Sequence, residues 1–318
     1  MSRQMRKRPG TMVLLNPFCS YGTGLKRWEQ VKDELGRRIG RFKTEVPDSP
    51  QRFAEYVSRA IRDGDNLLIA AGGDGTVNLL LNAVMTERGA HNRITLGAVG
   101  LGSSNDFHKP FRPQTFINGI PVRIDAKNAF LCDVIQISYQ YLEGMQNTQF
   151  CIINASIGIT AEANALFNER SGFIKVARKI SVEAAIVACA LKAMFTYHDI
   201  PCQLSIDDGE PKKLPVTNLG IIKNPHFAGH FCYDTPIKPD DGELGINLCG
   251  GTSMLERVGL IAGLAKARFQ GRPRTNCWSA THLTVESNRT FALELDGEVV
   301  RTRNARFKVI PKAVRCCL

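Results

Sequence analysis

The sequence lacks several patterns that would assign it at once to a common class of protein. Ten cysteines are spread along the 318 residues, but they form no C-x-x-C pair and no zinc-finger spacing. Thiols scattered among apolar runs favour reduced, buried cysteines over a disulfide framework or a zinc site. A basic helix with interleaved aromatic residues is also missing, so no recognised nucleic-acid-binding module is present and we expect no nucleic acid partner.

Long apolar runs and internal repeats are absent as well. The longest apolar run, residues 182–195, contains Glu183 and Lys192 and is too short to cross a bilayer. We favour a core helix for this run, with a membrane-facing helix as the alternative. The apolar stretch Met12–Leu15 is too short for the hydrophobic region of a signal peptide. The expectation is therefore a cytoplasmic protein, either soluble or peripherally bound to a membrane.

What the sequence does contain is an excess of positive charge on a chain able to form a large core. Hydrophobic residues make up 43% of the chain, which suits one large domain or two moderate ones. The formal net charge is +11 and the pI is near 9.3. Such a charge favours anionic partners, of which ATP and the surface of an acidic bilayer remain after the exclusions above. A basic tail at Arg3, Arg6, Lys7 and Arg8 is interpreted as a solvated end.

The first part of the chain alternates between apolar strand-like runs and amphipathic helical stretches. This alternation predicts a parallel sheet with helices on both faces, whose ligands bind at the carboxyl ends of the strands. The expected strands are 11–15, 41–45, 67–71 and 94–99, and the expected helices are about 25–38, about 50–62 and one ending near 85. Asn16, Thr44, Asp74 and Ser103 are expected just after strands, so they should converge on one edge of the sheet.

Beyond about residue 125 the pattern changes to short alternating segments separated by turn-prone residues. Segments of this kind predict an antiparallel β-sandwich, interrupted by helices near 173–196 and 254–269. The segments are 134–138, 150–153, 203–206, 219–222, 244–248, 283–285, 291–295 and 307–310. We therefore expect two domains, residues 1–125 and residues 126–318.

The stretch from residue 68 to residue 78 is the most informative part of the sequence. An apolar strand ends here in the run Gly72-Gly73-Asp74-Gly75-Thr76-Val77-Asn78, and helical residues follow. A glycine-rich turn at the start of a helix favours phosphate, because backbone N–H groups and the helix dipole both attract an anion. Asp74 would repel phosphate unless a metal ion or a proton transfer involves it, which indicates a metal nucleotide. The alternative is a tight turn in which Asp74 only caps the helix.

This run resembles the G-G-D-G-T-x-N signature of the diacylglycerol kinase catalytic family, which includes bacterial lipid kinases, sphingosine kinases and ceramide kinases. Other family motifs occur in the same order along nearly the whole chain. They are Asn16-Pro17 with Gly22-x-Gly24, the segment Gly100-Leu101-Gly102-Ser103-Ser104-Asn105-Asp106-Phe107, the segment 239–244, and Leu295-Asp296-Gly297-Glu298. The family is distantly related to NAD kinases and phosphofructokinases, so one motif alone would leave those relatives open.

The resemblance implies a Rossmann-like α/β nucleotide domain of the NAD kinase and phosphofructokinase type, followed by an antiparallel β-sandwich on the lipid-acceptor side, with the active site in the cleft between them. It also implies ATP and Mg²⁺ as cofactors. The residues implied to bind ATP are Asn16, Thr44, Gly72, Gly73, Asp74, Gly75, Thr76, Val77, Asn78 and Ser103. Asp106 would help to hold the magnesium of the nucleotide, with helix capping as the alternative role.

The resemblance further assigns catalysis to carboxylates. Glu298 is the implied general base on the acceptor hydroxyl, with Asp296 beside it and Asp74 as the third candidate. Phosphoryl transfer needs mainly positioning and charge neutralisation, so one base and magnesium suffice. Read without the other motifs, Asp296-Gly297 is only a hairpin turn, since D-G is a strong turn signal.

A second metal site and a lipid-contacting acid are implied in the later part of the chain. Asp241 would hold a structural Mg²⁺ with the carbonyl groups of Lys238 and Glu243, because this ion prefers oxygen ligands. Without the family, this segment is an ordinary turn. Glu162 is the candidate for contact with the lipid headgroup. Arg170 and Lys175 are candidates for phosphate contacts, although a solvated helix face is the favoured interpretation.

The resulting hypothesis is an ATP-dependent lipid kinase acting on diacylglycerol or on a sphingoid or ceramide-type lipid. The expected partners are this lipid and, peripherally, an anionic membrane surface, and the oligomeric state is open, with a homodimer as one option. Leu79 stands where the family usually has Glu, and Gly100 stands where it has Pro. Two alternatives remain: a soluble-substrate kinase of the NAD kinase type, and a degenerate nucleotide-binding regulatory protein, which only Leu79 favours.

Overall fold

The computed structural model describes residues 10–110, 113–168 and 182–318. They form two compact units, which differ from the division at 125/126 expected from the sequence. Unit 1 extends to Val134 and also includes Lys312–Leu318, whereas unit 2 is Ile135–Pro311. The difference arises because the last strand, β18 (Glu298–Cys316), begins in unit 2 and ends in unit 1, where Arg315 and Cys316 pair with β4.

The centre of unit 1 is a parallel sheet with the strand order β2-β1-β3-β4. All four strands lie close to their predicted positions, and β3 is buried at every residue. A hairpin of β5 (Thr115–Ile117) and β6 (Ile120–Arg123) extends the sheet beyond β4 in antiparallel orientation. The four parallel strands are β1 (Thr11–Leu15), β2 (Lys43–Glu45), β3 (Leu67–Gly72) and β4 (Thr95–Gly100).

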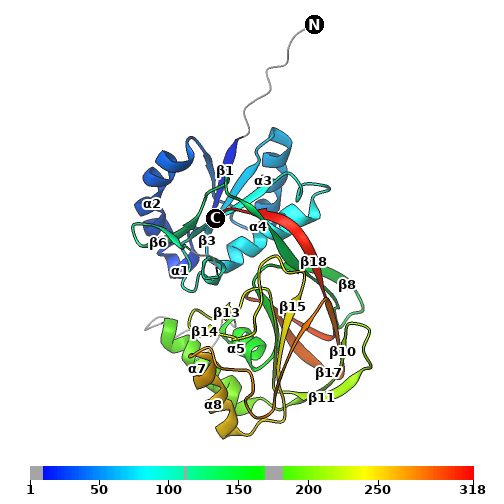
Figure 1. Cartoon of the computed structure of the whole chain (residues 1–318). Coiled ribbons are helices and arrows are strands. Elements are labelled where there is room, and N and C mark those ends of the chain that lie inside the picture. Colours follow the sequence, from blue (N-terminus) through cyan, green and yellow to red (C-terminus); the bar gives the residue numbers. More distant parts are fainter. Residues whose placement is uncertain (1–9, 111–112, 169–181) are drawn as a thin grey trace. The chain divides into compact units, whose positions relative to one another are not determined.

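Helices cover both faces of this sheet, as the alternating sequence pattern predicts (Figure 1). Trp28, Val31 and Leu35 of α2 pack on one face against a cluster that includes Val13 and Ile69. Helices α3 and α4 pack against each other, and α4 contacts β3 and β4. The helices of unit 1 are α1 (Cys19–Gly22), α2 (Gly24–Ile39), α3 (Pro50–Asp63), α4 (Asp74–Thr86) and the 3₁₀ helix η1 (Asp106–His108).

Unit 2 is an antiparallel β-sandwich, which confirms the predicted fold class. One layer has the order β16-β15-β12-β9-β17, and the other joins β11 and β10 to β17 and β18. Strand β17 belongs to both layers: a register shift between Glu286 and Phe291 marks the bend, so its first half pairs with β10 and its last residues pair with β9.

The strands of unit 2 are longer and more numerous than the sequence predicted. The predicted segments 283–285 and 291–295 are parts of one strand, β17, and the strands β9, β11, β13, β14 and β16 were not predicted. The strands are β7 (Phe130–Gln140, which starts in unit 1), β8 (Gln146–Cys151), β9 (Asn154–Gly158), β10 (Ile200–Ile206), β11 (Lys212–Val216), β12 (Asn218–Ile222), β13 (His226–Phe227), β14 (Phe231–Cys232), β15 (Leu244–Cys249), β16 (Thr275–Ala280), β17 (His282–Leu295) and β18.

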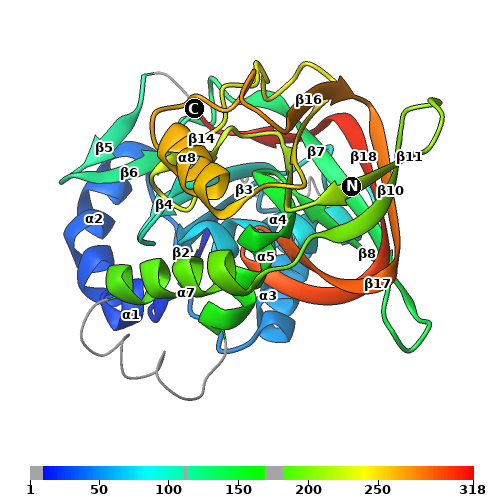
Figure 2. The ribbon, with the colours of Figure 1, turned by 90° about the horizontal axis from the view of Figure 1, so that it is seen from below.

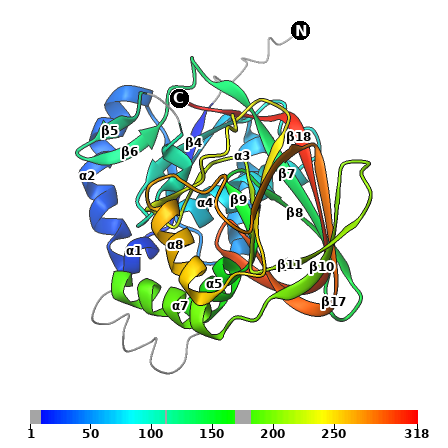
Figure 3. The ribbon, with the colours of Figure 1, turned by 60° about the horizontal axis from the view of Figure 1, so that its bottom comes forward.

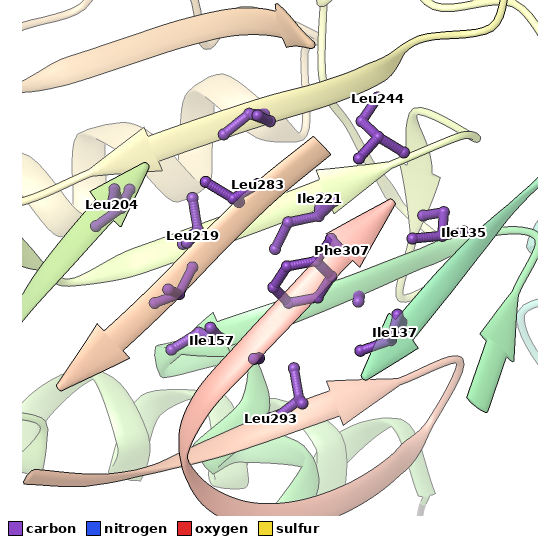
Figure 4. Close-up of a cluster of buried hydrophobic side chains, with 14 of the residues drawn as sticks. Ile135, Ile137, Ile157, Leu204, Leu219, Ile221, Leu244, Leu283, Leu293 and Phe307 are labelled. Carbon is purple, nitrogen blue, oxygen red and sulfur yellow. The ribbon is translucent and has the colours of Figure 1, made fainter. Parts of the chain in front are cut away.

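The core of unit 2 lies between the two layers of the sandwich. Figure 4 shows part of it, with Phe307 of β18 among Ile221 of β12, Leu283 of β17 and Ile137 of β7. All four side chains are inaccessible to solvent. This core is continuous through both layers, and it fixes the register of the long hairpin formed by β17 and β18.

Among the described residues, three helices accompany the sandwich. Helix α5 (Ile159–Asn168) packs on β9 and β17 and contacts α7 (Val182–Thr196), which in turn contacts α8 (Met254–Leu264) (Figures 2 and 3). The last two correspond to the predicted helices, although residues 173–181 of the first lie outside the described residues. The N-terminus of α8 has a complete capping box, in which Ser253 and Glu256 bond each other's backbone N–H groups.

Helix α7 is only partly a core helix. Four of its described side chains are buried: Ala185, Cys189, Ala193 and Met194. Three large apolar side chains on another face are exposed: Val187, Leu191 and Phe195. In the part of the chain that the structure describes, no helix has both the length and the apolar character needed to cross a membrane.

Candidate active site

The glycine-rich run of unit 1 joins β3 to α4. Strand β3 ends at Gly72 and the helix begins at Asp74, so only Gly73 lies between them, and residues 74–78 occupy the first turns of the helix. Gly72 has no room for a side chain, because a Cβ atom there would lie 2.2 Å from Thr76 Oγ1. The first N–H groups of a helix have no acceptor within the helix, so this end offers donors for an anion.

A second glycine-containing loop follows β4 and contacts the first one. A Cβ atom on Gly102 would lie 2.4 Å from the Cα atom of Gly73, so the two loops can approach only because both positions are glycine. The backbone N–H groups of Leu101 and Gly102 donate to the carbonyl of Gly72 at 2.8 and 3.3 Å. The exposed residue Ser103 follows in this loop. The two loops therefore form one continuous surface.

The carboxylate of Asp74 connects these loops to η1. Its two oxygens accept the backbone N–H groups of Asp106 and Phe107 at 3.1 and 3.0 Å. Asp106 is itself buried, and its Oδ1 lies 2.5 Å from the Nζ atom of Lys109. Both carboxylates are thus fixed, and Lys109 places a positive charge beside them.

Asn16 and Thr44 lie near the same edge of the sheet but differ in position. Asn16 follows β1, and its Nδ2 atom donates to Thr76 Oγ1 at 3.3 Å. Thr44 is exposed but lies within β2, opposite Val13 of β1, and not after the strand as the sequence suggested. The structure therefore brings Asn16 to the helix terminus, while Thr44 is on the neighbouring strand.

Arg27 of α2 is a residue of this region that sequence reasoning missed. Its guanidinium group donates to the carbonyls of Leu101 and Gly102 at 2.8 and 2.7 Å and to that of Gly100 at 3.1 Å. Three bonds from one planar group hold the second loop in place. No sequence signal marks Arg27, because the carbonyl groups that it contacts belong to residues far from it in the sequence.

In unit 2, Asp296-Gly297 is a two-residue hairpin turn between β17 and β18, and Glu298 is the first residue of β18. Leu295 and Glu298 pair across it, and both central residues have positive φ angles, 45° at Asp296 and 100° at Gly297. D-G favours such a turn because both of its positions require positive φ. The turn predicted from the dipeptide alone is confirmed, and it coexists with an unusual arrangement of carboxylates.

Asp296 and Glu298 have opposite environments. Asp296 is buried, and its carboxylate accepts the backbone N–H groups of Ile152 and Asn154 at 3.2 and 3.0 Å. Glu298 is exposed. The turn therefore holds one carboxylate rigidly within the protein and presents the other to solvent.

A third carboxylate, Glu294, lies under this turn and was not predicted. Its oxygens accept the N–H group of Gly297 at 2.6 Å and the hydroxyl of Ser156 at 2.8 Å. Burial raises the pKa of Glu294 to about 7, against hydrogen bonds from Ser156 and Gly297 that lower it. No sequence signal marks this burial, because alternation with Leu293 and Leu295 places Glu294 on the opposite face of the strand from the core leucines.

Glu162, the predicted lipid-contacting acid, is in the first turn of α5 and forms a two-pronged ion pair with Arg301 of β18. The second pair of atoms, Arg301 Nη2 and Glu162 Oε2, lies 2.8 Å apart. Glu162 also lines a hollow of about 290 Å³ together with Lys192, Tyr197 and Arg289.

The predicted magnesium site around Asp241 contains an amino group. The Nζ atom of Lys223 lies 2.6 Å from Asp241 Oδ1 and 2.8 Å from the carbonyl oxygen of Glu243. Among the described residues, no group of three or more His, Cys, Asp or Glu side chains is arranged to hold a metal ion. The remaining candidates, Arg170 and Lys175 and the basic tail at residues 3–8, lie outside the described residues.

Comparison with known proteins identifies the family. Residues 10–136 match the family model of the diacylglycerol kinase catalytic domain, and residues 154–318 match that of the YegS C-terminal NAD kinase beta sandwich-like domain. The chain belongs to the diacylglycerol kinase catalytic family. The catalytic-domain match makes the protein an ATP-dependent kinase, so the enzyme class predicted from the sequence is confirmed.

Relatives of this kinase extend over almost its whole length. A protein of Pectobacterium atrosepticum named probable lipid kinase YegS-like is 27% identical over 331 residues, covering 99% of this chain and 97% of the relative. A protein of Escherichia coli O17:K52:H18 named probable lipid kinase YegS is 25% identical over 325 residues, with the same coverage. A solved structure of a diacylglycerol kinase from Bacillus anthracis str. Sterne has a TM-score of 0.68 at 15% identity over 98% of this chain and 97% of that one, which shows that the fold is shared.

Proposed function

We propose that this kinase transfers the γ-phosphate of ATP to a hydroxyl group of a membrane lipid, diacylglycerol or a sphingoid or ceramide-type lipid. The observation that carries the proposal is the hairpin of unit 2, which presents the exposed Glu298 on a turn held by the buried Asp296. A solvent-facing carboxylate on a rigid turn can reach the hydroxyl of an incoming substrate, which a buried one cannot.

The reaction assigned to Glu298 is general base catalysis. Its carboxylate accepts the proton of the acceptor hydroxyl while that oxygen forms a bond to the γ-phosphorus. The bond from the γ-phosphorus to the β,γ-bridging oxygen breaks, and ADP leaves with the electron pair. Asp296 takes no proton in this scheme; it positions Glu298 by fixing the turn.

The nucleotide is assigned to the loops of unit 1. The N–H groups of Gly73, which precedes α4, and of its first residues Asp74 and Gly75 would bind the phosphates. The rest of the site would be lined by Asn16, Thr44, Thr76, Val77, Asn78 and Ser103. Asp74 and Asp106 would supply oxygen donors of the kind that magnesium prefers, and they are adjacent, with Asp74 Oδ2 3.1 Å from the Asp106 N atom. Because Asp106 Oδ1 already lies 2.5 Å from the Lys109 ammonium, that oxygen is not assigned to the ion. The bound Mg²⁺ would neutralise phosphate charge.

The test of the proposal is ATP-dependent labelling of lipid alcohols presented in mixed micelles. We expect one lipid to be phosphorylated by the wild type and not by Glu298→Gln. Glu286→Gln is the matched control, because Glu286 is an exposed glutamate of the same hairpin. Phosphorylation of NAD and of no lipid would overturn the proposed acceptor. ATP binding without phosphorylation of any acceptor would support a regulatory protein and point to Leu79.

We also propose that unit 2 contacts an anionic membrane peripherally through α7 and α8. The exposed Val187, Leu191 and Phe195 of α7 are spaced by four residues and so lie along one face. Leu255 and Val258 are exposed on the neighbouring α8. Exposed basic residues accompany them, among them Lys192, and the chain carries a net charge of +11. An apolar stripe with adjacent cations fits an acidic lipid surface.

Sedimentation with phosphatidylcholine vesicles, with and without phosphatidylglycerol, tests this contact. The double change Leu191→Ser and Phe195→Ser should weaken binding by about tenfold or more, since each buried apolar side chain contributes about 1.5–3 kcal/mol. Leu142→Ser, at an exposed residue of the β7–β8 turn, is the control. If the double variant binds vesicles normally but converts a dimer of the wild type into a monomer, the stripe is instead a homodimer interface.

A further inference from the structure

The turn that contains Asp241 is organised around one buried amino group. Lys223 follows β12 directly, and its side chain is only 1% exposed. Its Nζ atom lies 2.6 Å from Asp241 Oδ1 and 2.8 Å from the carbonyl oxygen of Glu243. The same carboxylate accepts the N–H groups of Lys238 at 2.6 Å and Glu243 at 3.1 Å. The ammonium group and the turn therefore form one closed set of hydrogen bonds.

These contacts do not fit a divalent cation. The magnesium ligands implied by the family resemblance are the carboxylate of Asp241 and the carbonyls of Lys238 and Glu243. Two of these three oxygens already face the Lys223 ammonium. Magnesium binds oxygen at about 2.0–2.1 Å, so an ion on the same two oxygens would take the place of Nζ or lie directly against a like charge.

Displacing the lysine to admit an ion would be costly. Its side chain is buried, so an ammonium moved from these oxygens would lose its partners without reaching water. Burial acts to raise the pKa of Asp241, but the hydrogen bonds from Lys223, Lys238 and Glu243 lower it, so the carboxylate stays charged opposite the lysine. The pair is self-sufficient.

We propose that the Nζ atom of Lys223 is a built-in cation of the Asp241 turn, and that it replaces a divalent metal ion there. The consequence is that unit 2 keeps this turn folded without magnesium or calcium. The inference concerns the stability of the turn and does not depend on the acceptor of the kinase or on its activity.

The test is the thermal unfolding midpoint of the nucleotide-free protein in EDTA, in MgCl₂ and in CaCl₂. The wild type should show the same midpoint in all three. Lys223→Ala should unfold about 10 °C lower in EDTA, because it leaves the Asp241 carboxylate without its partner. Added Mg²⁺ or Ca²⁺ should raise the unfolding midpoint of this variant part of the way back to the wild-type value, and the rise should saturate with ion concentration. The reason is that the alanine opens a space next to two oxygen ligands.

Two further variants show whether Lys223→Ala opens a site for a cation or only destabilises the fold. Lys223→Met removes the charge but keeps most of the volume, so its lower midpoint should not respond to either ion. Adding Asp241→Asn to Lys223→Ala should abolish the rescue. Lys213→Ala, at an exposed lysine of β11, should match the wild type in every buffer.

The proposal is overturned if Mg²⁺ or Ca²⁺ raises the midpoint of the wild type saturably and Asp241→Asn removes that rise. It is equally overturned if Lys223→Ala is as insensitive to the ions as Lys223→Met. Should Lys223→Ala not fold, isothermal titration of Mg²⁺ into the wild type and Asp241→Asn decides. The two heat curves should coincide, and a binding event present only in the wild type would contradict the inference.

Discussion

The β3–α4 turn of unit 1 and the β17–β18 hairpin of unit 2 are held in place in the same way but differ in the carboxylates that they expose. In each, an aspartate next to glycine accepts two backbone N–H groups from a distant segment: Asp74 from Asp106 and Phe107, and Asp296 from Ile152 and Asn154. Only the hairpin adds a second, exposed carboxylate, Glu298. The fixed aspartates hold the two turns in place, and the proposed function assigns the proton transfer to the exposed Glu298.

The largest effect is expected at the exposed carboxylate. Glu298→Gln should lower the rate of lipid phosphorylation by about 10²–10⁴, the usual contribution of a general base. Its unfolding midpoint should stay at the wild-type value, because the side chain is exposed. Measuring the phosphorylation rate and the unfolding midpoint of the same variant checks both expectations. A variant with normal activity would remove the distinction between Glu298 and the two aspartates.

The fixed aspartates should show a different combination of losses. Asp74→Asn and Asp296→Asn each turn one accepting oxygen into an amide group that faces an N–H donor. Each should lower the free energy of unfolding by about 1–3 kcal/mol, as measured by urea denaturation, and should also reduce activity. Asp208→Asn, at a fully exposed side chain, is the control and should change stability by less than about 0.5 kcal/mol. Wild-type stability in both variants would show that the two turns do not need these carboxylates.

Glu294 should make the hairpin sensitive to pH. Its folded-state pKa, raised to about 7 from 4.5 by burial, exceeds that of the unfolded chain, so the folded protein holds the proton more tightly. Its contribution is fully present below about pH 4.5 and is lost as pH rises to about 7. Glu294→Gln, which stays neutral, should match the wild type at low pH and exceed it by up to about 3 kcal/mol at pH 8.

The wild-type curve alone does not isolate this effect, because His108 acts in the opposite direction. Burial, assisted by the Arg123 guanidinium, lowers the pKa of His108 from 6.5 to about 3. The stability that the neutral histidine contributes is therefore present above about pH 6.5 and is lost as pH falls towards 3. Urea denaturation at each pH gives the difference in the free energy of unfolding between the wild type and Glu294→Gln. The effect of His108 is the same in both proteins and cancels in this difference. A difference that is constant from pH 5 to pH 8 would show that Glu294 does not titrate in this window.

The smallest of these effects is expected at Arg27, which acts through the second loop. Arg27→Lys loses the planar group that bonds three carbonyls. We expect the KM for ATP to rise by about three- to tenfold while kcat changes less, since in the proposed site this loop positions the nucleotide and does not react. Arg37→Lys, at an exposed arginine of the same helix, is the control. An equal fall in kcat with no change in KM would assign Arg27 a role in the chemical step.

The sequence predicted the elements whose signal is local. The buried run of β3, the glycines after it and the D-G dipeptide at residues 296–297 each identify a structure from neighbouring residues. Asn16 is placed correctly because β1 ends beside it. Thr44 was expected just after a strand but lies within β2. This strand is only three residues long, and its polar residues do not show where it stops.

The contacts that complete the site depend on residues far apart in the chain. Arg27 meets a loop 73–75 positions later, and Asp296 meets a segment 142–144 positions earlier. Lys223 has no motif around it, so its amino group could not be predicted to lie where a magnesium ion was expected. Helix α5 was missed because it begins directly at the end of β9, without a capping residue between them.

The central claim is that Glu298 moves the proton and Asp296 holds the turn, and chemical rescue tests it most directly. Glu298→Ala leaves an exposed space in which a small carboxylate can replace the missing base, whereas Asp296→Ala leaves a buried defect. The measurement is the rate of lipid phosphorylation by both variants as formate is added. The account predicts a saturable rise for Glu298→Ala and none for Asp296→Ala. Rescue of Asp296→Ala alone, or a wild-type rate for Glu298→Ala without formate, would contradict it.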